Sequence, residues 1–235
     1  MARADPLGVA CAFYGGAYAE VLRQYTGREY RILHPQCEAR DDSLLAEQQL
    51  DAVERLLQGS PDSVVLVDEA YIDFGGETIL PFLDAHRNLV IGRTFAKAYG
   101  LAALRAGCLI AHPGTLEPIR ATLSPYNLNV AAAAALRAAI ADRDWHDRYV
   151  RESSESRTLI YDFCDANGLP YYRSAANFVL VRVGAQAAAV TRALAEQGIF
   201  IRDRSNQPGC EGCVRITAGL TAHTERCLRA LGDLL

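Results

Sequence analysis

Two short apolar runs, each ending in polar residues, constrain the fold of this chain more than any other feature. The first run is VVLVDE at 64–69, and the second is NLVIGRTF at 88–95. Each is too short for a helix and is rich in apolar residues, which indicates a buried strand of an α/β sheet. In such sheets ligands bind beyond the carboxyl ends of the strands. We therefore expect Asp68, Tyr71, Thr94 and Lys97 to line one pocket.

Side chains of complementary chemistry follow these two strands. Asp68 and Tyr71 come after the first strand, and Thr94, Lys97 and Arg105 come after the second. Burial favours the neutral form of a lysine, which is nucleophilic. A lysine, a carboxylate, a phenol, a hydroxyl and an arginine together suit pyridoxal phosphate. In that interpretation the lysine forms the Schiff base, the aspartate and the tyrosine contact the ring, and the other two hold the phosphate.

The segments DEAYIDF at 68–74 and RTFAKAYGLAALRAG at 93–107 resemble the histidinol-phosphate aminotransferase family, a group of fold-type-I pyridoxal-phosphate enzymes. The family pattern is DEAY followed by R-T-x-S-K-A-x-G-L-A-G-x-R-x-G. The resemblance implies that Lys97 is the Schiff-base lysine and that Asp68 is the partner of the ring nitrogen. It also implies that Tyr71 hydrogen-bonds the ring oxygen and that Thr94 and Arg105 bind the phosphate.

The chain departs from the family pattern at three places. Ala96 replaces a serine that contacts the cofactor phosphate, which removes a hydrogen bond worth about 1 to 3 kcal/mol. At 39–45 the chain has ARDDSLL where the family has an N-P-N-N-P-T-G loop, and family members carry a glycine-rich turn upstream of Met1. The resemblance covers 14–235, so we expect a family member that lacks the N-terminal part and binds the cofactor more weakly.

The order of strand and helix patterns predicts two α/β domains. Residues 1–130 are expected to form a partial cofactor-binding large domain with a mainly parallel sheet. Residues 131–235 are expected to form a small C-terminal domain that is entered through a long helix. Tyr14 precedes a predicted helix at 17–25, and the resemblance implies that its ring stacks on the cofactor. An aromatic side chain that only packs under this helix is an equally good interpretation.

Two arginines stand out in the C-terminal part. Arg202 and Arg215 lie in or beside apolar strands, FIRD and CVRIT, where an unpaired guanidinium is costly. An arginine fork binds carboxylate or phosphate through two hydrogen bonds. The resemblance implies that Arg215 binds the α-carboxylate of the substrate and that Arg202 binds a substrate phosphate. Internal ion pairs with Asp203 or Glu211 are the structural alternative.

Composition excludes several other functions. The net charge of −4 and the scattered arginines give no basic surface for nucleic acid. Seven irregularly spaced cysteines and no recognisable signal peptide indicate the cytoplasm. Cys210 and Cys213 form a C-x-x-C without a second ligand pair, so no metal site is expected. No apolar run approaches the roughly 20 residues of a membrane span.

The predicted activity is that of a pyridoxal-phosphate-dependent aminotransferase. The resemblance implies a role in histidine biosynthesis and a homodimeric protein. The partners are small molecules: an amino acid or amino alcohol phosphate, and a 2-oxo acid. Two alternatives stay open within the same fold, a decarboxylase of a phosphorylated amino acid and a catalytically impaired relative without a full cofactor cage. A nucleotide hydrolase would need the G-x-x-x-x-G-K-[ST] loop, which this sequence lacks.

Overall fold

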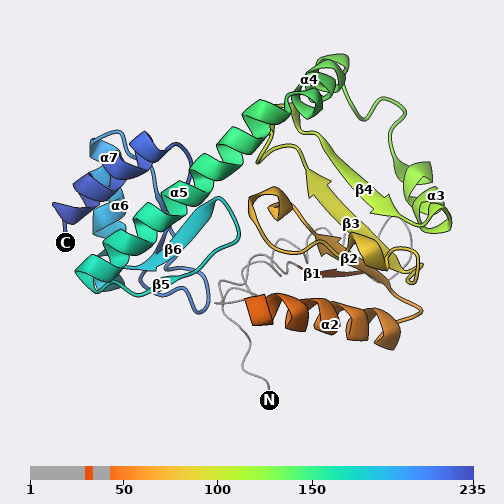
Figure 1. Cartoon of the computed structure of the whole chain (residues 1–235), viewed down its shortest axis with the longest axis horizontal. Helices are drawn as coiled ribbons and strands as arrows, with labels where there is room; N and C mark the ends of the chain where they lie inside the picture. Colours follow the sequence, from red (N-terminus) through yellow and green to blue (C-terminus); the bar gives the residue numbers. More distant parts are fainter. Residues whose placement is uncertain (1–29, 34–42) are drawn as a thin grey trace. The chain divides into compact units, whose positions relative to one another are not determined.

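The computed structural model of the chain describes residues 30–33 and 43–235. They form two compact units (Figure 1). The N-terminal unit contains β1 and Asp41–Arg143, and the C-terminal unit contains Asp144–Leu235. Tyr14, the helix predicted at 17–25 and most of the segment 39–45 lie outside the described residues, so those expectations stay predictions.

The N-terminal unit is built on a four-stranded sheet with the order β1-β2-β3-β4. The strands are β1 (Tyr30–Leu33), β2 (Val64–Asp68), β3 (Leu89–Thr94) and β4 (Gly107–Ala111). The first three are parallel, and β4 runs antiparallel to β3. The prediction of a mainly parallel sheet is confirmed. The last strand runs antiparallel and forms one edge of the sheet.

Helices cover both faces of this sheet. Successive strand residues point to opposite faces, so the two sets of apolar residues form two separate clusters. On one face α2 (Ser43–Gly59) packs its apolar stripe against the strands through Val53, Leu57, Val65, Val67, Leu89 and Ile91. On the other face α3 (Pro113–Thr122) places Ile119 against Leu66 and Val90. The predicted helices at 46–59 and 115–123 are therefore confirmed within a few residues.

The alanine-rich helix α4 (Val130–Ala141) completes the N-terminal unit. Its first turn is capped by Asn129, whose side-chain oxygen accepts a hydrogen bond of 2.8 Å from the backbone N–H of Ala132. This cap explains why the helix begins at Val130.

The C-terminal unit is an antiparallel sheet with helices packed on one face. The strand order is β5-β6-β8-β7, and the strands are β5 (Tyr171–Tyr172), β6 (Phe178–Arg182), β8 (Cys213–Thr217) and β7 (Arg202–Asp203). The helices are α5 (Arg143–Asn167), α6 (Ala187–Glu196) and α7 (Thr221–Gly232). Their core is Ile160, Val179, Val181, Leu194, Val214, Ile216 and Leu231. The alternation of strands and helices predicted for this half is confirmed.

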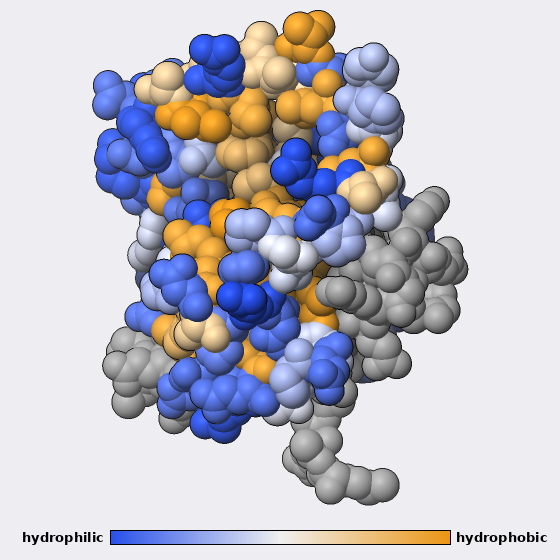
Figure 2. Space-filling model, turned by 90° about the vertical axis from the view of Figure 1, so that its right-hand side faces the viewer, coloured by the Kyte–Doolittle hydropathy of each residue, from blue (hydrophilic) through white to orange (hydrophobic). Residues whose placement is uncertain are grey.

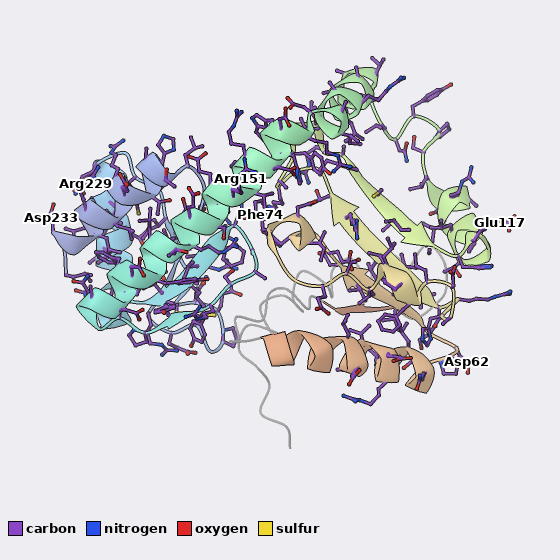
Figure 3. All side chains as sticks on the ribbon, viewed as in Figure 1. Asp62, Phe74, Glu117, Arg151, Arg229 and Asp233 are labelled. Atoms are coloured by element: carbon purple, nitrogen blue, oxygen red, sulfur yellow. The ribbon has the colours of Figure 1, made fainter. Side chains whose placement is uncertain are left out.

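Charged side chains lie on the outside of both units. Figure 3 shows Asp62 and Glu117 on the N-terminal unit and Arg151 and Arg229 on helices of the C-terminal unit, all of them exposed. No described helix is long and apolar enough to cross a membrane. Within 30–33 and 43–235, no group of His, Cys, Asp or Glu could hold a metal ion.

Candidate active site

A cavity of about 670 Å³ opens where β2 and β3 end. Four of the residues predicted from the sequence line it, namely Asp68, Thr94, Lys97 and Arg105. Much of the remaining wall is apolar and consists of Leu66, Leu109, Leu116, Ile119 and Leu123. This volume falls in the range of about 300 to 1,000 Å³ that small-molecule sites occupy. The structure thus gathers one carboxylate, one hydroxyl, one amine and several guanidiniums, including that of Arg105, in a space suited to a cofactor.

Asp68 is the last residue of β2, where it lies opposite Gly92 of β3. Its Oδ1 accepts a hydrogen bond of 2.9 Å from the backbone N–H of Ala70, which fixes the orientation of the carboxylate. The chain then turns through Tyr71 into the short 3-10 helix Ile72–Phe74. Phe74, labelled in Figure 3, is buried and anchors this turn.

Lys97 lies on a tight turn after β3. Its carbonyl accepts a hydrogen bond of 3.0 Å from the N–H of Gly100, which has a φ of 68°. The rings of Phe95 and Tyr99 meet edge to face at 5.3 Å on either side of the lysine in sequence. The amine Nζ is 5.3 Å from the centroid of the Tyr71 ring, close enough for a cation–π contact. Tyr71 therefore joins the group through Lys97, although it does not line the cavity.

Lys97 is also the only lysine in the sequence. Every other cationic side chain apart from the histidines is an arginine, whose guanidinium stays protonated and is not a nucleophile. The cavity thus contains the one side-chain amine of the whole chain. The sequence carried this signal, which strengthens the assignment of Lys97 more than the spacing of the surrounding motif does.

Thr94 and Arg105 flank the lysine turn. The Oγ1 of Thr94 accepts a hydrogen bond of 3.1 Å from the N–H of Ala96, which leaves the hydroxyl hydrogen able to donate. Arg105 has a φ of 53°, and it is the only non-glycine residue with positive φ among the described residues. Its Nη1 donates to the carbonyl of Ala102 at 3.1 Å. Such strained positions cluster at functional sites, where the surrounding structure holds them.

The next strand begins with a contact that only glycine allows. A Cβ on Gly107 would lie 2.8 Å from the carbonyl oxygen of Arg93, inside the closest approach of real Cβ atoms. This contact explains the A-G pair after Arg105 in the sequence. It also brings β4 directly against β3 at the rim of the cavity, where Gly107 pairs with Thr94.

Several polar residues at or beside the cavity were not predicted from the sequence. Glu69 is 1% exposed, and its carboxylate forms an ion pair with Arg93 at 2.8 Å. The sequence offered a signal, because each residue extends an apolar run in which an isolated charge needs a partner. Arg120 and Asn127 also line the cavity and carried no recognisable motif.

The cysteine of the site is a poor nucleophile. Cys108 lines the cavity, and burial raises the pKa of its thiol, an effect that the nearby Arg93 guanidinium opposes. In the C-terminal unit, burial raises the pKa of Cys164 to about 12 and that of Cys227 to about 11. Because the thiolate is the reactive form, none of these three thiols competes with Lys97 at neutral pH.

The two predicted substrate arginines lie in the C-terminal unit on neighbouring strands. Arg202 of β7 is directly opposite Arg215 of β8 in the antiparallel register. Side chains opposite each other in an antiparallel pair project on the same face. Since Val214 and Ile216 belong to the helix-covered core, Arg215 projects from the other face of the sheet. The guanidinium carbon of Arg215 is 5.0 Å from the Phe178 ring centroid, which orients it.

The nearby carboxylates are bound to the connecting loop. Oδ1 of Asp203 accepts from the N–H of Ser205 at 2.8 Å, and hydrogen bonds from Ser205 lower the pKa of this carboxyl group. Oε1 of Glu211 accepts from the N–H of Gly209 at 2.9 Å, and backbone hydrogen bonds lower its pKa as well. Both carboxylates are therefore used to shape the loop between β7 and β8. The arrangement of two guanidiniums on one face is suited to an anionic ligand.

The sequence was compared with known protein families and proteins. The family model for aminotransferases of class I and II matches residues 17–231. The chain belongs to this family of pyridoxal-phosphate-dependent transaminases. A histidinol-phosphate aminotransferase of Pseudomonas entomophila is 36% identical to this chain over 236 residues, which cover 95% of the chain and 67% of the relative.

Solved structures show the same fold. The histidinol-phosphate aminotransferase of Sinorhizobium meliloti in complex with pyridoxal-5'-phosphate is 27% identical, with a TM-score of 0.71. The match covers 92% of this chain and 62% of the Sinorhizobium meliloti chain. The L-threonine-O-3-phosphate decarboxylase of Porphyromonas gingivalis is 25% identical, with a TM-score of 0.70, and the match covers 87% and 64% of the two chains. The chain therefore has the fold-type-I architecture and spans about two thirds of the length of these relatives.

Proposed function

We propose that this aminotransferase moves an amino group between a phosphorylated amino alcohol or amino acid and a 2-oxo acid, with histidinol phosphate as the first candidate donor. The observation that carries the proposal is the cavity in which Lys97, Asp68, Thr94 and Arg105 meet. The name of the Pseudomonas entomophila relative supports the choice of donor. The N-terminal unit would bind the cofactor, and the C-terminal unit would bind the substrate through its arginines.

The residues of the cavity fit pyridoxal phosphate. When bound, this cofactor supplies an aldehyde that reacts with amines and a ring that withdraws electrons from the substrate Cα. Lys97 would hold the aldehyde carbon through Nζ, and Thr94 and Arg105 would bind the phosphate oxygens. Asp68 would keep a proton on the ring nitrogen, and Tyr71 would hydrogen-bond the ring oxygen. Stacking of Tyr14 on the ring stays a prediction.

Lys97 would have a second role once a substrate amine takes its place. Its free amine could then accept the proton from the substrate Cα and later give a proton back, which is general base and general acid catalysis by one group. The contact between Nζ and the Tyr71 ring supports this role because it restrains the amine near the cavity. The mostly apolar wall of the cavity would limit access of water to the reacting atoms.

The two arginines of the C-terminal unit support the proposed class of substrate. An α-carboxylate is common to amino acids and 2-oxo acids, so its ligand should be rigid, as Arg215 is in the centre of β8 beside Phe178. Arg202 is exposed and begins the short edge strand β7, so it can reach the variable end of a substrate. Two adjacent guanidiniums match a substrate that carries both a carboxylate and a phosphate, or a phosphate alone.

Substitution of the two arginines should separate these roles. We expect Arg215→Lys to raise KM for every carboxylate substrate, because a lysine point charge cannot reproduce the guanidinium fork. We expect Arg202→Ala to raise KM about tenfold or more for phosphorylated substrates only, since a charged hydrogen bond contributes about 1.5 to 3 kcal/mol. Steady-state assays with phosphorylated and plain amino donors measure both effects. Arg192→Ala, at an exposed arginine of α6, is the control.

The division of roles between the arginines is wrong if both substitutions raise KM equally for phosphorylated and plain substrates. In that case Arg202 supports the edge strand and does not select the substrate. An equal effect of Arg192→Ala would show that net charge, rather than the position of either arginine, controls substrate binding.

A direct assay distinguishes amino transfer from decarboxylation. A phosphate-binding arginine pair would also suit a decarboxylase of a phosphorylated amino acid, and the Porphyromonas gingivalis structure carries such a name. The protein with added pyridoxal phosphate is incubated with histidinol phosphate and a 2-oxo acid, and separately with phosphothreonine. Formation of a new amino acid from the 2-oxo acid supports the proposal. Release of carbon dioxide supports the decarboxylase, and absence of both reactions supports the impaired relative.

We also propose that the chain forms a homodimer in the cytoplasm. Large apolar side chains are exposed between α3 and α4 and at the start of α4, where Tyr126 is 91% and Val130 is 86% exposed. Figure 2, which views the molecule from the side of α3 and β4, shows hydrophobic residues on the surface between hydrophilic ones. Exposed apolar groups of this size commonly mark a protein interface. The five described cysteines are free thiols, which suits a reducing compartment.

A further inference from the structure

A buried ion pair joins the ends of the two strands that carry the cofactor residues. The side chain of Glu69 is 1% exposed and that of Arg93 is 31% exposed. The Glu69 carboxylate accepts hydrogen bonds from Nε and Nη2 of Arg93 at 2.9 and 2.8 Å. It also accepts from the hydroxyl of Thr78 at 2.9 Å and from the backbone N–H of Ile79 at 2.8 Å. Nη2 of Arg93 also donates to the Thr78 hydroxyl, at 2.8 Å.

The ion pair borders the cavity: Arg93 is one of the residues that line it, and Glu69 does not line it. Glu69 continues the row of Val65 and Val67, and Arg93 continues the row of Leu89 and Ile91, both of which pack under α2. The neighbouring residues Asp68 and Thr94 continue the rows of the opposite face. Each member of the ion pair is therefore adjacent in sequence to a residue that lines the cavity.

The position of the pair coincides with the end of the strand ladder. The last register pair of β2 and β3 is Asp68 with Gly92, and the N–H of Glu69 donates to the carbonyl of Gly92 at 2.8 Å. Immediately beyond this hydrogen bond, the guanidinium of Arg93 continues the connection between the strands β2 and β3. Through Thr78 and Ile79, the same carboxylate also holds the segment that follows the Tyr71 turn.

We propose that the Glu69–Arg93 pair positions the cofactor residues by holding Asp68 and Tyr71 in register with Thr94 and Lys97; this inference rests on the proposed function. A buried ion pair is seldom the most stabilising choice for such a site, because an apolar pair of similar volume often stabilises the fold as well or better. What the fork adds is a fixed orientation of the two strand ends. The cofactor would be bound at its ring and at its phosphate simultaneously. A small shift between the two strand ends would therefore weaken cofactor binding.

The test compares two ends of the same strand. Glu69→Gln and Arg93→Lys remove the charged fork at the carboxyl end of β3. Asn88→Ser is the matched control, because Nδ2 of Asn88 donates to the carbonyls of Leu57 and Ser60 at 3.1 and 3.0 Å next to the amino end of β3. For each variant, pyridoxal phosphate is titrated against the protein by absorbance, and the melting temperature is measured on the same preparation.

We expect Glu69→Gln and Arg93→Lys to raise the dissociation constant of pyridoxal phosphate at least tenfold. The double variant should bind no more weakly than Glu69→Gln alone, because the two residues act as one unit. Asn88→Ser should lower the melting temperature but change the dissociation constant less than twofold. That contrast would separate positioning of the cofactor from a general loss of stability.

Three results would overturn the inference. The first is a wild-type dissociation constant in Glu69→Gln or in Arg93→Lys; the latter keeps a positive charge opposite Glu69 and decides the matter if Glu69→Gln does not fold. The second is an equal rise in Asn88→Ser, which would reduce the ion pair to a stabiliser of the fold. The third is failure of the unaltered chain to bind pyridoxal phosphate, which would overturn the proposed function itself.

Discussion

A Lys97→Arg variant should keep its fold and lose amino transfer. Arginine retains a positive charge beside the Tyr71 ring, so the cation–π contact at 5.3 Å can persist. The guanidinium cannot act as a nucleophile or as a base, because it stays protonated. Loss of the general base alone should lower the rate by about 10²- to 10⁴-fold. The measurement is the rate of amino transfer at saturating substrate, with the melting temperature as the test of folding.

The sequence allows covalent attachment of the cofactor to Lys97 to be tested directly. Because Lys97 is the only lysine, the other primary amine of the chain is that of the N-terminus. Borohydride reduction in the presence of pyridoxal phosphate should therefore attach one cofactor to the peptide that contains Lys97. The Lys97→Arg variant should lose this label. A label that stays on the N-terminal peptide in both proteins would contradict the assignment.

An Asp68→Asn variant should also lose activity while its structure survives. The two side chains have the same shape, and asparagine can still accept the 2.9 Å hydrogen bond from the N–H of Ala70. Only the negative charge is removed, so the ring nitrogen of the cofactor would no longer be held in its protonated form. We expect a fall in rate of about 10²- to 10³-fold, as for other losses of a preorganised electrostatic group.

A single-turnover measurement is the appropriate assay for this variant. The conversion of the bound cofactor by an amino donor is followed by absorbance, since this isolates the chemical step from product release. Asp84→Asn, at an exposed carboxylate of the same unit, is the control. If Asp68→Asn reacts at the rate of the unaltered protein, the role of Asp68 at the ring nitrogen is wrong.

The parts of the site that could be predicted are local in the sequence. Asp68 and Thr94 end apolar strands, and Lys97 and Arg105 follow in the turn directly after the second strand, so strand ends and a short motif were enough to place them in one cavity. In the same way, Gly168 directly follows α5 and has a φ of 63°, which is typical of a glycine after a helix. Local patterns determine these features because neighbouring residues create them.

The features that could not be predicted depend on the register between strands. Glu69 and Arg93 are 24 residues apart, and their pairing follows from the parallel alignment of β2 with β3. The opposition of Arg202 and Arg215 likewise depends on how β7 aligns with β8 across the intervening loop. A single sequence specifies the faces of each strand but not its partner, so contacts between strands required the structure.

The contact between Gly107 and the carbonyl of Arg93 has a consequence for how substrate preference can change. Any side chain at Gly107 would have to push β4 away from β3, so this edge of the cavity tolerates no substitution. Leu109 and Leu123 line the same cavity and are 39% and 50% exposed, so either can be enlarged or shortened without a cost to the core. Natural variation and laboratory selection for new substrates should therefore accumulate on the leucine side of the cavity, while the glycine edge stays constant.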